Sequence, residues 1–289
     1  DGSEKIYNVN VTRKGGVTSL KNEIMENKVI TAKPTLTTTS EKSGDESGLY
    51  KSIDTNTGAP TYYFRGNVTN NYVKFAGFTW RIVRVNEDGT VRIVMQDGIN
   101  NNANYTFNSN YNNYTYMYYT NSEAKTTLES WYQTNIGSKS DLAKNVASGA
   151  YYCEQAKAKY DDSYTSGNAT MTTYNKYTPD FKCSNDGNGK GLVNASVGLL
   201  TYDELVYAGS YRGKNNSNYY LYNSAITWWT MSPAGFMSGY SDVWCVYTEG
   251  AISYDYANRT YAVRPVLNLT ADTQISDGDG TKENPFVVK

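Results

Sequence analysis

The sequence predicts an α+β fold built mainly from antiparallel strands, with two short helices and long irregular loops. Two observations predict it. Many stretches alternate apolar and polar residues, which is typical of half-buried strands. Stretches with the apolar spacing of a helix are few and short, and strands and helices do not alternate over a long stretch as they do in a parallel α/β fold. A chain of 289 residues can form one large domain or two small ones with a substantial core.

The N-terminal part is predicted to be distinct from the rest. Residues 17–30, "VTSLKNEIMENKVI", place Leu20, Ile24 and Met25 near one helical face, and a polar stretch without apolar period follows. We therefore expect residues 1–45 to form an N-terminal helix and a linker-like segment, and residues 46–289 to form the domain. The segment is either a stalk to a surface anchor, which the polar stretch favours, or a helix that packs on the domain.

The first strong strand signal is a hairpin. Residues 79–98 read "TWRIVRVNEDGTVRIVMQDG", in which apolar and polar residues alternate on both sides of the turn. Asn86, Asp88 and Gly89 supply residue types that hairpin turns prefer.

Two helices are predicted after this hairpin. Residues 123–136 space Leu128, Trp131, Tyr132 and Ile136 along one face. The second helix lies in "TYDELVYAG", residues 201–209, where Thr201 and Glu204 have the spacing of a capping box and Gly209 stands at a C-terminal stop.

The C-terminal third predicts three further strand regions, "ITWWTMSP", "DVWCVYTEGAISYDY" and "TYAVRPVLNL". Glu249 and Gly250 stand at the turn inside the second region. The last polar stretch, "SDGDGTKENPF", predicts a turn. Asp277 and Asp279 resemble the start of a calcium loop, but the later acidic ligands are missing, so no metal site is assigned.

Composition excludes several classes of function. The net charge is -1, from 27 basic and 28 acidic residues, so we expect neither nucleic acid nor an anionic membrane as a partner. No apolar stretch is long enough to insert in a membrane, and no signal region opens the chain. Because the first residue is Asp1 and not Met, we expect a secretion signal or anchor to have been removed or left out, and an extracellular location.

The chain contains no histidine, which removes Ser-His-Asp and Cys-His catalysis and every His-ligated metal site. We assign no catalytic residue and no cofactor. Of the three cysteines, Cys153 and Cys183 flank a polar insert and are predicted to form a disulfide. Cys245 lies in an alternating apolar run and is expected to be a buried thiol, with pairing to another chain as the alternative.

Several linked blocks carry a resemblance to a known family: "YYFRGN", "FAGFTWRIVRVNEDGTVRIV", "GLLTYDELVYAG", "NYYLYN", "WWTMSP", "YAVRPVLNL" and "SDGDGTKENPFVV". Across residues 46–289 the chain closely resembles a family of uncharacterised secreted or surface proteins of low-GC Gram-positive bacteria. That family is similar to the C-type lectin-like fold of formylglycine-generating enzymes and of the variable receptor-binding proteins of diversity-generating retroelements. This implies that "TWRIVRV" and "YAVRPVLNL" pair, and that Trp228, Trp229 and Pro233 pack in the core beneath them.

The activities of related folds do not carry over. Formylglycine-generating enzymes hold copper with a pair of cysteines near the C-terminus, where this chain has only Cys245, and their "GGSW"-like signature is absent. The calcium-dependent sugar site of animal C-type lectins also lacks its tripeptides here.

Asparagine and tyrosine are abundant in residues 101–120 and 213–224 and, more diffusely, in residues 239–261. Tyrosine offers a large rigid contact and asparagine adaptable hydrogen bonds, as in antibody paratopes, although an AT-rich genome also enriches both residue types. The first stretch is expected to be a loop on a folded scaffold, and it supplies the candidate contacts Tyr111, Tyr114 and Tyr116. The retroelement resemblance adds candidates from the C-terminal excursion: Tyr240, Trp244, Tyr247, Tyr254, Tyr256 and Asn258. Because neighbouring strand residues face opposite sides, only some of these can be exposed.

The leading hypothesis is a non-enzymatic, extracellular binding or adhesion module, secreted or anchored to the cell surface, which presents these loops to a glycan or protein on another cell or surface. One alternative is a structural subunit of a bacterial surface assembly. The other is a glycoside hydrolase that uses two carboxylates. Its candidate acids, Asp161, Asp162, Asp203 and Glu204, stand in turn or helix-cap contexts, which favours structural roles for them.

Overall fold

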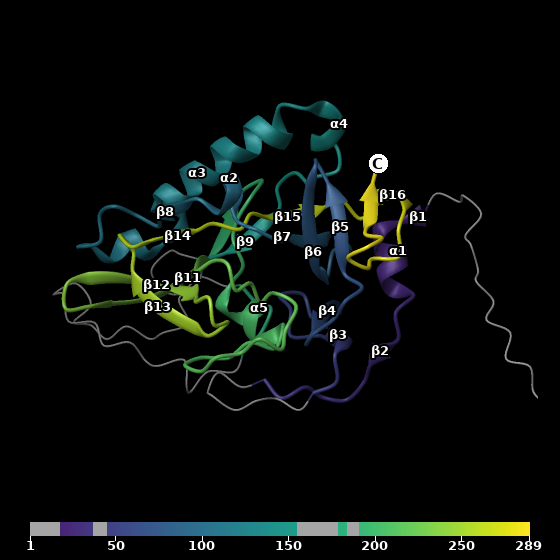
Figure 1. The fold of residues 1–289 in the computed structure, drawn as a ribbon, viewed down its shortest axis with the longest axis horizontal. Coiled ribbons are helices and arrows are strands. Elements are labelled where there is room, and N and C mark those ends of the chain that lie inside the picture. Colours follow the sequence, from purple (N-terminus) through teal and green to yellow (C-terminus); the bar gives the residue numbers. More distant parts are fainter. Residues whose placement is uncertain (1–17, 37–44, 155–178, 184–190) are drawn as a thin grey trace, which may run out of the picture.

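The computed structural model describes residues 18–36, 45–154, 179–183 and 191–289, and all that follows concerns these residues (Figure 1). They form a mixed α+β fold dominated by strands, as predicted. The helical elements are α1 (Leu20–Met25), α2 (Ile99–Asn102), η1 (Tyr114–Met117), η2 (Tyr119–Asn121), α3 (Glu123–Tyr132), η3 (Gln133–Gly137), α4 (Ser140–Ala143) and α5 (Tyr202–Tyr207).

One sheet occupies the right half of Figure 1. Its main path runs in the order β1-β16-β17-β5-β6-β4-β3-β2, and β7 and β15 continue from β6. These strands are β1 (Thr18–Ser19), β2 (Val29–Ile30), β3 (Gly48–Ser52), β4 (Thr61–Arg65), β5 (Tyr72–Phe75), β6 (Phe78–Val85), β7 (Val91–Met95), β15 (Val266–Leu269), β16 (Gln274–Asp277) and β17 (Phe286–Val288).

A second sheet of five strands has the order β13-β12-β11-β14-β8 and lies at the left of Figure 1. Its members are β8 (Asn104–Thr106), β11 (Trp228–Met237), β12 (Tyr240–Val246), β13 (Ile252–Tyr256) and β14 (Thr260–Ala262). β9 (Tyr151–Cys153) and β10 (Leu192–Asn194) pair with each other in a separate two-stranded sheet. The three C-terminal strand regions expected from the sequence are therefore present.

The predicted hairpin is β6 and β7. They pair antiparallel from Trp80 opposite Met95 to Val85 opposite Val91, and the amide of Asn86 donates to the carbonyl of Thr90 across the turn. The predicted partner of the last strand was wrong: β15 pairs with β7 and not with β6. The reason is that β6 already pairs with β4, β5 and β7, so only the free edge of β7 remains for β15.

The N-terminal segment packs on the domain, so the stalk favoured by its polar sequence is not what residues 18–36 form. Leu20 and Ile24 of α1 are fully buried in the main core. β1 pairs with β16 and β2 pairs with β3, at opposite ends of the large sheet. The short apolar face of α1 therefore packs against the domain. Most of the linker-like stretch, residues 37–44, lies outside the described residues.

The two predicted helices are present. α3 buries Leu128, Trp131 and Tyr132, as the apolar spacing indicated, and the hydroxyl of Ser122 caps its first turn. α5 begins with the predicted capping box, in which the Thr201 hydroxyl accepts from the Glu204 amide and the Glu204 carboxylate accepts from the Thr201 amide. Gly209 follows α5 with a φ of +105°.

The Asn/Tyr-rich stretch is folded onto the scaffold. It begins with a left-handed turn in which Asn100, Asn101 and Asn102 all have positive φ, a conformation that asparagine tolerates better than most residues. The chain then adds β8 to the second sheet and forms η1 and η2. Met117, Tyr118 and Tyr119 are fully buried, so the loop expected here is partly a core element.

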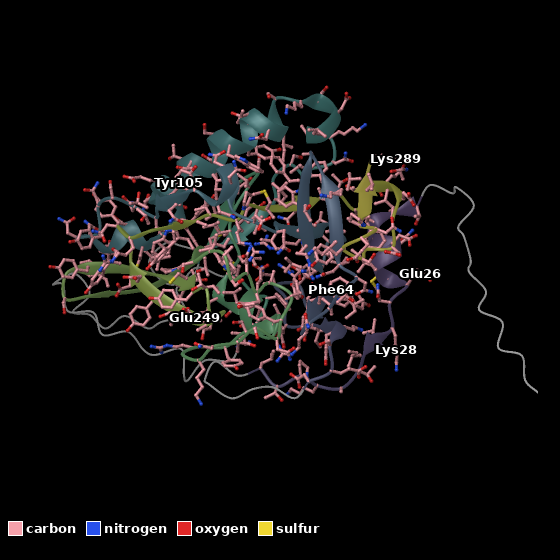
Figure 2. The ribbon with its side chains drawn as sticks, viewed as in Figure 1. Glu26, Lys28, Phe64, Tyr105, Glu249 and Lys289 are labelled. Carbon is pink, nitrogen blue, oxygen red and sulfur yellow. A yellow bond between two sulfur atoms is a disulfide. The ribbon has the colours of Figure 1, made fainter. Side chains whose placement is uncertain are left out.

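Most of the core consists of apolar and aromatic side chains between the sheets and helices (Figure 2). Trp228, Trp229 and Pro233 are buried on β11, as predicted. Trp228 lies beneath the guanidinium of Arg264, which is 4.6 Å from its ring. Within the described residues, no helix has the length and apolarity needed to cross a membrane.

Candidate functional site

Three tyrosines form a cluster at the surface, in which Tyr240 and Tyr256 are exposed and Tyr111 is half-buried. We call it the tyrosine cluster. The rings of Tyr111 and Tyr240 stack with centroids 5.1 Å apart and planes 19° apart. Tyr256 lies 5.3 Å from Tyr240 and 6.0 Å from Tyr111. Tyr240 and Tyr256 keep 38% and 40% of their surface exposed, while most large apolar side chains of the described part are buried.

Two hydrogen bonds from Ser241 to the loop that carries Tyr111 hold this cluster in place. The amide of Ser241 donates to the carbonyl of Tyr111, and the hydroxyl of Ser241 donates to the carbonyl of Asn113. The β11–β12 turn that leads into Tyr240 has positive φ at Ser238 and Gly239, as two-residue hairpin turns require. The three rings are thus fixed before any ligand arrives, which lowers the entropy cost of binding.

A buried acid lies next to the tyrosine cluster. Asp242 follows Tyr240 on the same face of β12 and is paired across the strands with Tyr256. It is only 2% exposed, and within the described residues no hydrogen bond or ion pair holds its carboxylate. Burial, with a further contribution from nearby Asp255, raises the pKa of Asp242 to about 7.

The other predicted contact residues lie outside the tyrosine cluster. Trp244 is fully buried and its ring packs against Tyr202, so it is not a surface contact. Tyr254 is half-buried beside Trp244, and Tyr247 packs edge-on against Tyr261. Strand alternation and core packing explain this division. The remaining three candidates are all half-buried: Tyr114, Tyr116 and Asn258.

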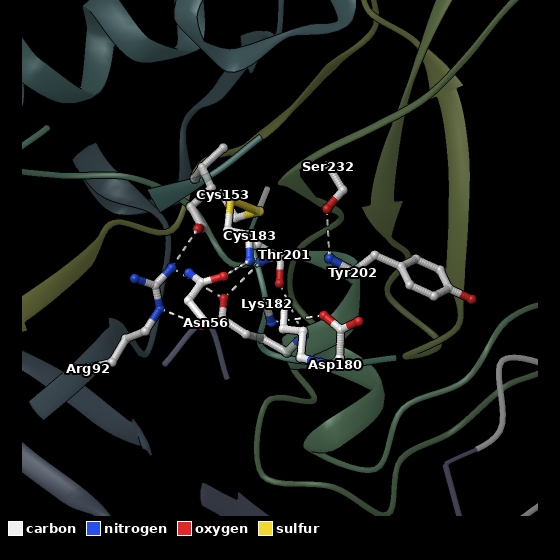
Figure 3. The surroundings of a disulfide bond; sticks show 11 residues. Asn56, Arg92, Cys153, Asp180, Lys182, Cys183, Thr201, Tyr202 and Ser232 are labelled. Atoms are coloured by element: carbon white, nitrogen blue, oxygen red, sulfur yellow. Dashed lines mark hydrogen bonds and ion pairs between the residues drawn. A yellow bond between two sulfur atoms is a disulfide. The ribbon is translucent and has the colours of Figure 1, made fainter. Parts of the chain in front are cut away.

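A second feature is a cavity of about 430 Å³ between the β6–β7 hairpin, the start of α5 and the disulfide. Figure 3 shows Arg92, Asn56 and Thr201 around the disulfide at this place, and all three line the cavity. The exposed residues Asp88 and Leu192 also line it, so it reaches the surface of the described part. We call it the charged cavity because it is lined by both arginine and carboxylate side chains.

The wall of the charged cavity contains an Arg-Glu-Arg triad. Glu204 Oε1 lies 2.5 Å from Arg92 Nε and 3.4 Å from Arg84 Nε. Arg92 and Glu204 are each 3% exposed, whereas the Arg84 side chain is 16% exposed. Burial alone raises the pKa of Glu204, but the charges of Arg92 and Arg84 outweigh it and hold that pKa below its usual value.

This geometry bears on the carboxylates considered for glycoside hydrolysis. Glu204 accepts from two arginines and from the Thr201 amide, and an acid held ionised in this way is a poor proton donor. Asp203 lines the same cavity, while Asp161 and Asp162 lie outside the described residues.

The turn predicted near the C-terminus is present, and Asp277 and Asp279 accept there from the amides of Gly278 and Thr281.

The predicted disulfide between Cys153 and Cys183 is present, with Cα atoms 5.6 Å apart. It joins β9 to a short segment that carries Phe181, and the Cys183 amide donates to the side chain of Asn56. Cys245 is a buried free thiol, as expected, and burial raises its pKa well above the usual value.

Sequence reasoning did not predict the charged cavity. Arg84 and Arg92 stand in the alternating pattern of the hairpin, where polar residues are expected to face solvent. Glu204 was correctly predicted as a cap residue, but the capping role hid its second role as the partner of both arginines. The available signal was an arginine inside each of two strongly apolar strands. An arginine buried in such a strand needs an acid to neutralise its charge.

Comparison with known proteins identifies a family for this chain. The model of a family described as "Domain of unknown function (DUF6273)" matches residues 110–271. No match was found among curated proteins or among solved structures. The matched span contains the tyrosine cluster and α5, whereas the β6–β7 hairpin precedes it.

Proposed function

This chain belongs to the DUF6273 family, whose description states no function, and we propose from the geometry of the chain itself that it is a non-enzymatic extracellular binding module. It presents the tyrosine cluster to a glycan or protein ligand. The observation that carries the proposal is the stack of Tyr111 on Tyr240, with Tyr256 beside both. Exposed tyrosines that are already packed together bind partners at small entropy cost.

The surroundings of the cluster support recognition of a polar ligand. Asn113 is exposed in the same loop, and Asp255 and Arg259 form an ion pair near Tyr256. Aromatic faces beside amide and carboxylate groups suit the apolar and hydroxyl faces of a sugar, and they equally suit a protein surface. The test below therefore includes both classes of ligand, glycans and proteins.

The extracellular location is part of the proposal. Its support is the Cys153–Cys183 disulfide, because such bonds persist in oxidising compartments and are rare in the cytosol. We also propose that the α+β fold is of the C-type lectin-like kind. Its support is that β15 returns to the N-terminal hairpin after a long excursion that carries the second sheet.

The test is a glycan and protein array probed with the purified chain and with Tyr240→Ala and Tyr256→Ala. We expect each variant to fold and to lose about 10-fold or more in affinity, as removal of a central interface tyrosine does. Tyr62→Ala is the control, because it makes the same substitution at a partly exposed tyrosine that lies on β4. Retained binding by both cluster variants would overturn the proposed surface, and no binding by the unaltered chain would favour a structural subunit.

A further inference from the structure

Arg84 is a cation of the charged cavity that keeps a donor atom available. Its guanidinium lies over the ring of Phe181, 4.7 Å from the ring centroid, in a cation–π contact. Its hydrogen bonds to Glu204 and Thr61 are both long, at 3.4 Å, and use Nε and Nη1. Within the described residues, Nη2 has no hydrogen-bond partner. An arginine edge of this kind is suited to a carboxylate or another oxyanion.

Arg92 differs from Arg84 because it is more deeply buried and lies against both carboxylate oxygens of Glu204. Its Nε and Nη2 contact the two carboxylate oxygens of Glu204, and Nη1 lies 3.4 Å from the side-chain oxygen of Asn268. With one carboxylate shared between two guanidinium groups, the triad carries one excess positive charge. This excess lies on the side of Arg84, which is the more exposed of the two.

Most carboxylates of the cavity wall accept hydrogen bonds from the protein. Glu87 accepts from the amide and hydroxyl of Thr57, and Asp88 accepts from the amide and hydroxyl of Thr90. Asp180 accepts from a backbone amide, and Asp203 is also not free. The wall therefore offers an anionic ligand a spare donor at Arg84.

The surrounding charge limits how much negative charge the ligand can carry. In the described part, five carboxylates and three cationic side chains line the cavity. Even hydrogen-bonded carboxylates repel a second negative charge, so a monoanion or zwitterion is favoured over a phosphate dianion. The volume of about 430 Å³ lies within the usual range of small-molecule pockets.

We propose that the charged cavity is a binding site for a small monoanionic carboxylate, which Arg84 holds through its guanidinium edge. Amino acids and sugar acids both carry this group. Phe181 positions Arg84, and the Cys153–Cys183 disulfide ties the Phe181 segment to β9. This site is separate from the tyrosine cluster and does not depend on the function proposed for that cluster.

The test is isothermal titration of the full chain with four probes: L-alanine, D-glucuronate, D-glucose and inorganic phosphate. We expect saturable binding of L-alanine or D-glucuronate, weaker binding of phosphate and none of glucose. The carboxylate that binds identifies the source of the ligand. Absence of binding by both carboxylates, or equal binding of glucose or phosphate, would overturn the proposal.

Arg84→Lys keeps the positive charge beside Glu204 but removes the guanidinium edge. We expect it to lower carboxylate affinity about 10-fold or more. Arg212→Lys is the matched control, since Arg212 is also half-buried over an aromatic ring, at 5.3 Å from Trp244, but does not line the cavity. Unchanged affinity in a folded Arg84→Lys variant would rule out the assigned role.

A spectroscopic measurement on the unaltered chain covers the case in which the variant does not fold. In ¹⁵N-arginine-labelled protein, the Nε–H resonance of Arg84 should move as D-glucuronate or L-alanine is added, while that of Arg212 should not. A titration that leaves the Arg84 resonance in place contradicts the proposal whatever the variant does.

Discussion

The ring of Tyr111 stacks on the ring of Tyr240, with centroids 5.1 Å apart, although the two residues come from distant parts of the sequence. The stack joins the Asn/Tyr-rich stretch to the β11–β12 hairpin. The proposed binding surface exists only because both parts fold together.

A double-mutant cycle should measure this relationship. We expect Tyr111→Ala and Tyr240→Ala to be coupled by about 0.5–1.5 kcal/mol in the free energy of unfolding, as is typical of aromatic pairs. Chemical denaturation of the two single variants and the double variant gives the coupling. Strict additivity would mean that the rings do not stack in solution.

The Asn/Tyr-rich stretch should divide into a structural and a superficial part. Tyr118→Ala is expected to destabilise the fold by about 3–5 kcal/mol, because Tyr118 is fully buried and its removal leaves a cavity. Tyr116→Ala should cost about 1 kcal/mol or less, since Tyr116 is only half-buried. Thermal unfolding of both variants checks the difference, and similar effects of the two would contradict the fold described for this stretch.

Removal of the Glu204 charge should destabilise the fold strongly. Glu204→Gln leaves Arg84 and Arg92 without their carboxylate, and breaking a buried pair in this way costs about 3–5 kcal/mol. Glu129→Gln is the control, because Glu129 is 43% exposed and forms an i,i+4 ion pair with Lys125 on the surface of α3. The control should change stability by about 0.5 kcal/mol or less. Urea denaturation at neutral pH compares the two.

The same residue should give a pH dependence. The pKa of Glu204 in the folded state is below its ordinary value of 4.5, so the stabilisation is present above about pH 4.5 and is lost as pH falls through the folded pKa. The difference in unfolding free energy between the unaltered chain and Glu204→Gln should therefore shrink below pH 4.5. A difference that stays constant down to pH 2 would contradict the ionised triad.

Asp242 should have the opposite pH dependence. Its folded pKa of about 7 lies above the ordinary value of 3.8, so the folded state holds the proton more tightly than the unfolded state. Its favourable contribution is complete below pH 3.8 and is lost as pH rises through 7. Asp242→Asn should therefore gain about 2–4 kcal/mol relative to the unaltered chain between pH 4 and pH 8. Denaturation at these two pH values tests this, and an unchanged difference would contradict it.

The disulfide should contribute to stability mainly through the unfolded chain. Its cysteines are 30 positions apart, so the chain-entropy relation gives about 3–4 kcal/mol for the closed loop. Cys153→Ala combined with Cys183→Ala should lose about this amount, and reductant should lower the stability of the unaltered chain but not of the double variant. An equal loss of stability in both proteins on adding reductant would mean that the loss does not come from this disulfide.

Local sequence signals predicted the elements that depend on neighbours in the chain. The β6–β7 hairpin follows from alternation around a turn, and α5 follows from the spacing of Thr201, Glu204 and Gly209. The disulfide followed from the position of two cysteines around a polar insert. Each of these depends on residues whose chemistry and spacing can be read directly along the chain.

Only the tertiary structure decided how distant segments meet. The sequence by itself determined an α+β fold with its hairpin, its capped helices and its disulfide. It did not determine that α1 packs in the core, that β15 pairs with β7, that Tyr111 meets Tyr240 or that Glu204 meets Arg84. The physical reason is that periodicity and capping are local, whereas pairing and burial are settled by which strand edges and apolar faces remain unfilled when the whole chain packs.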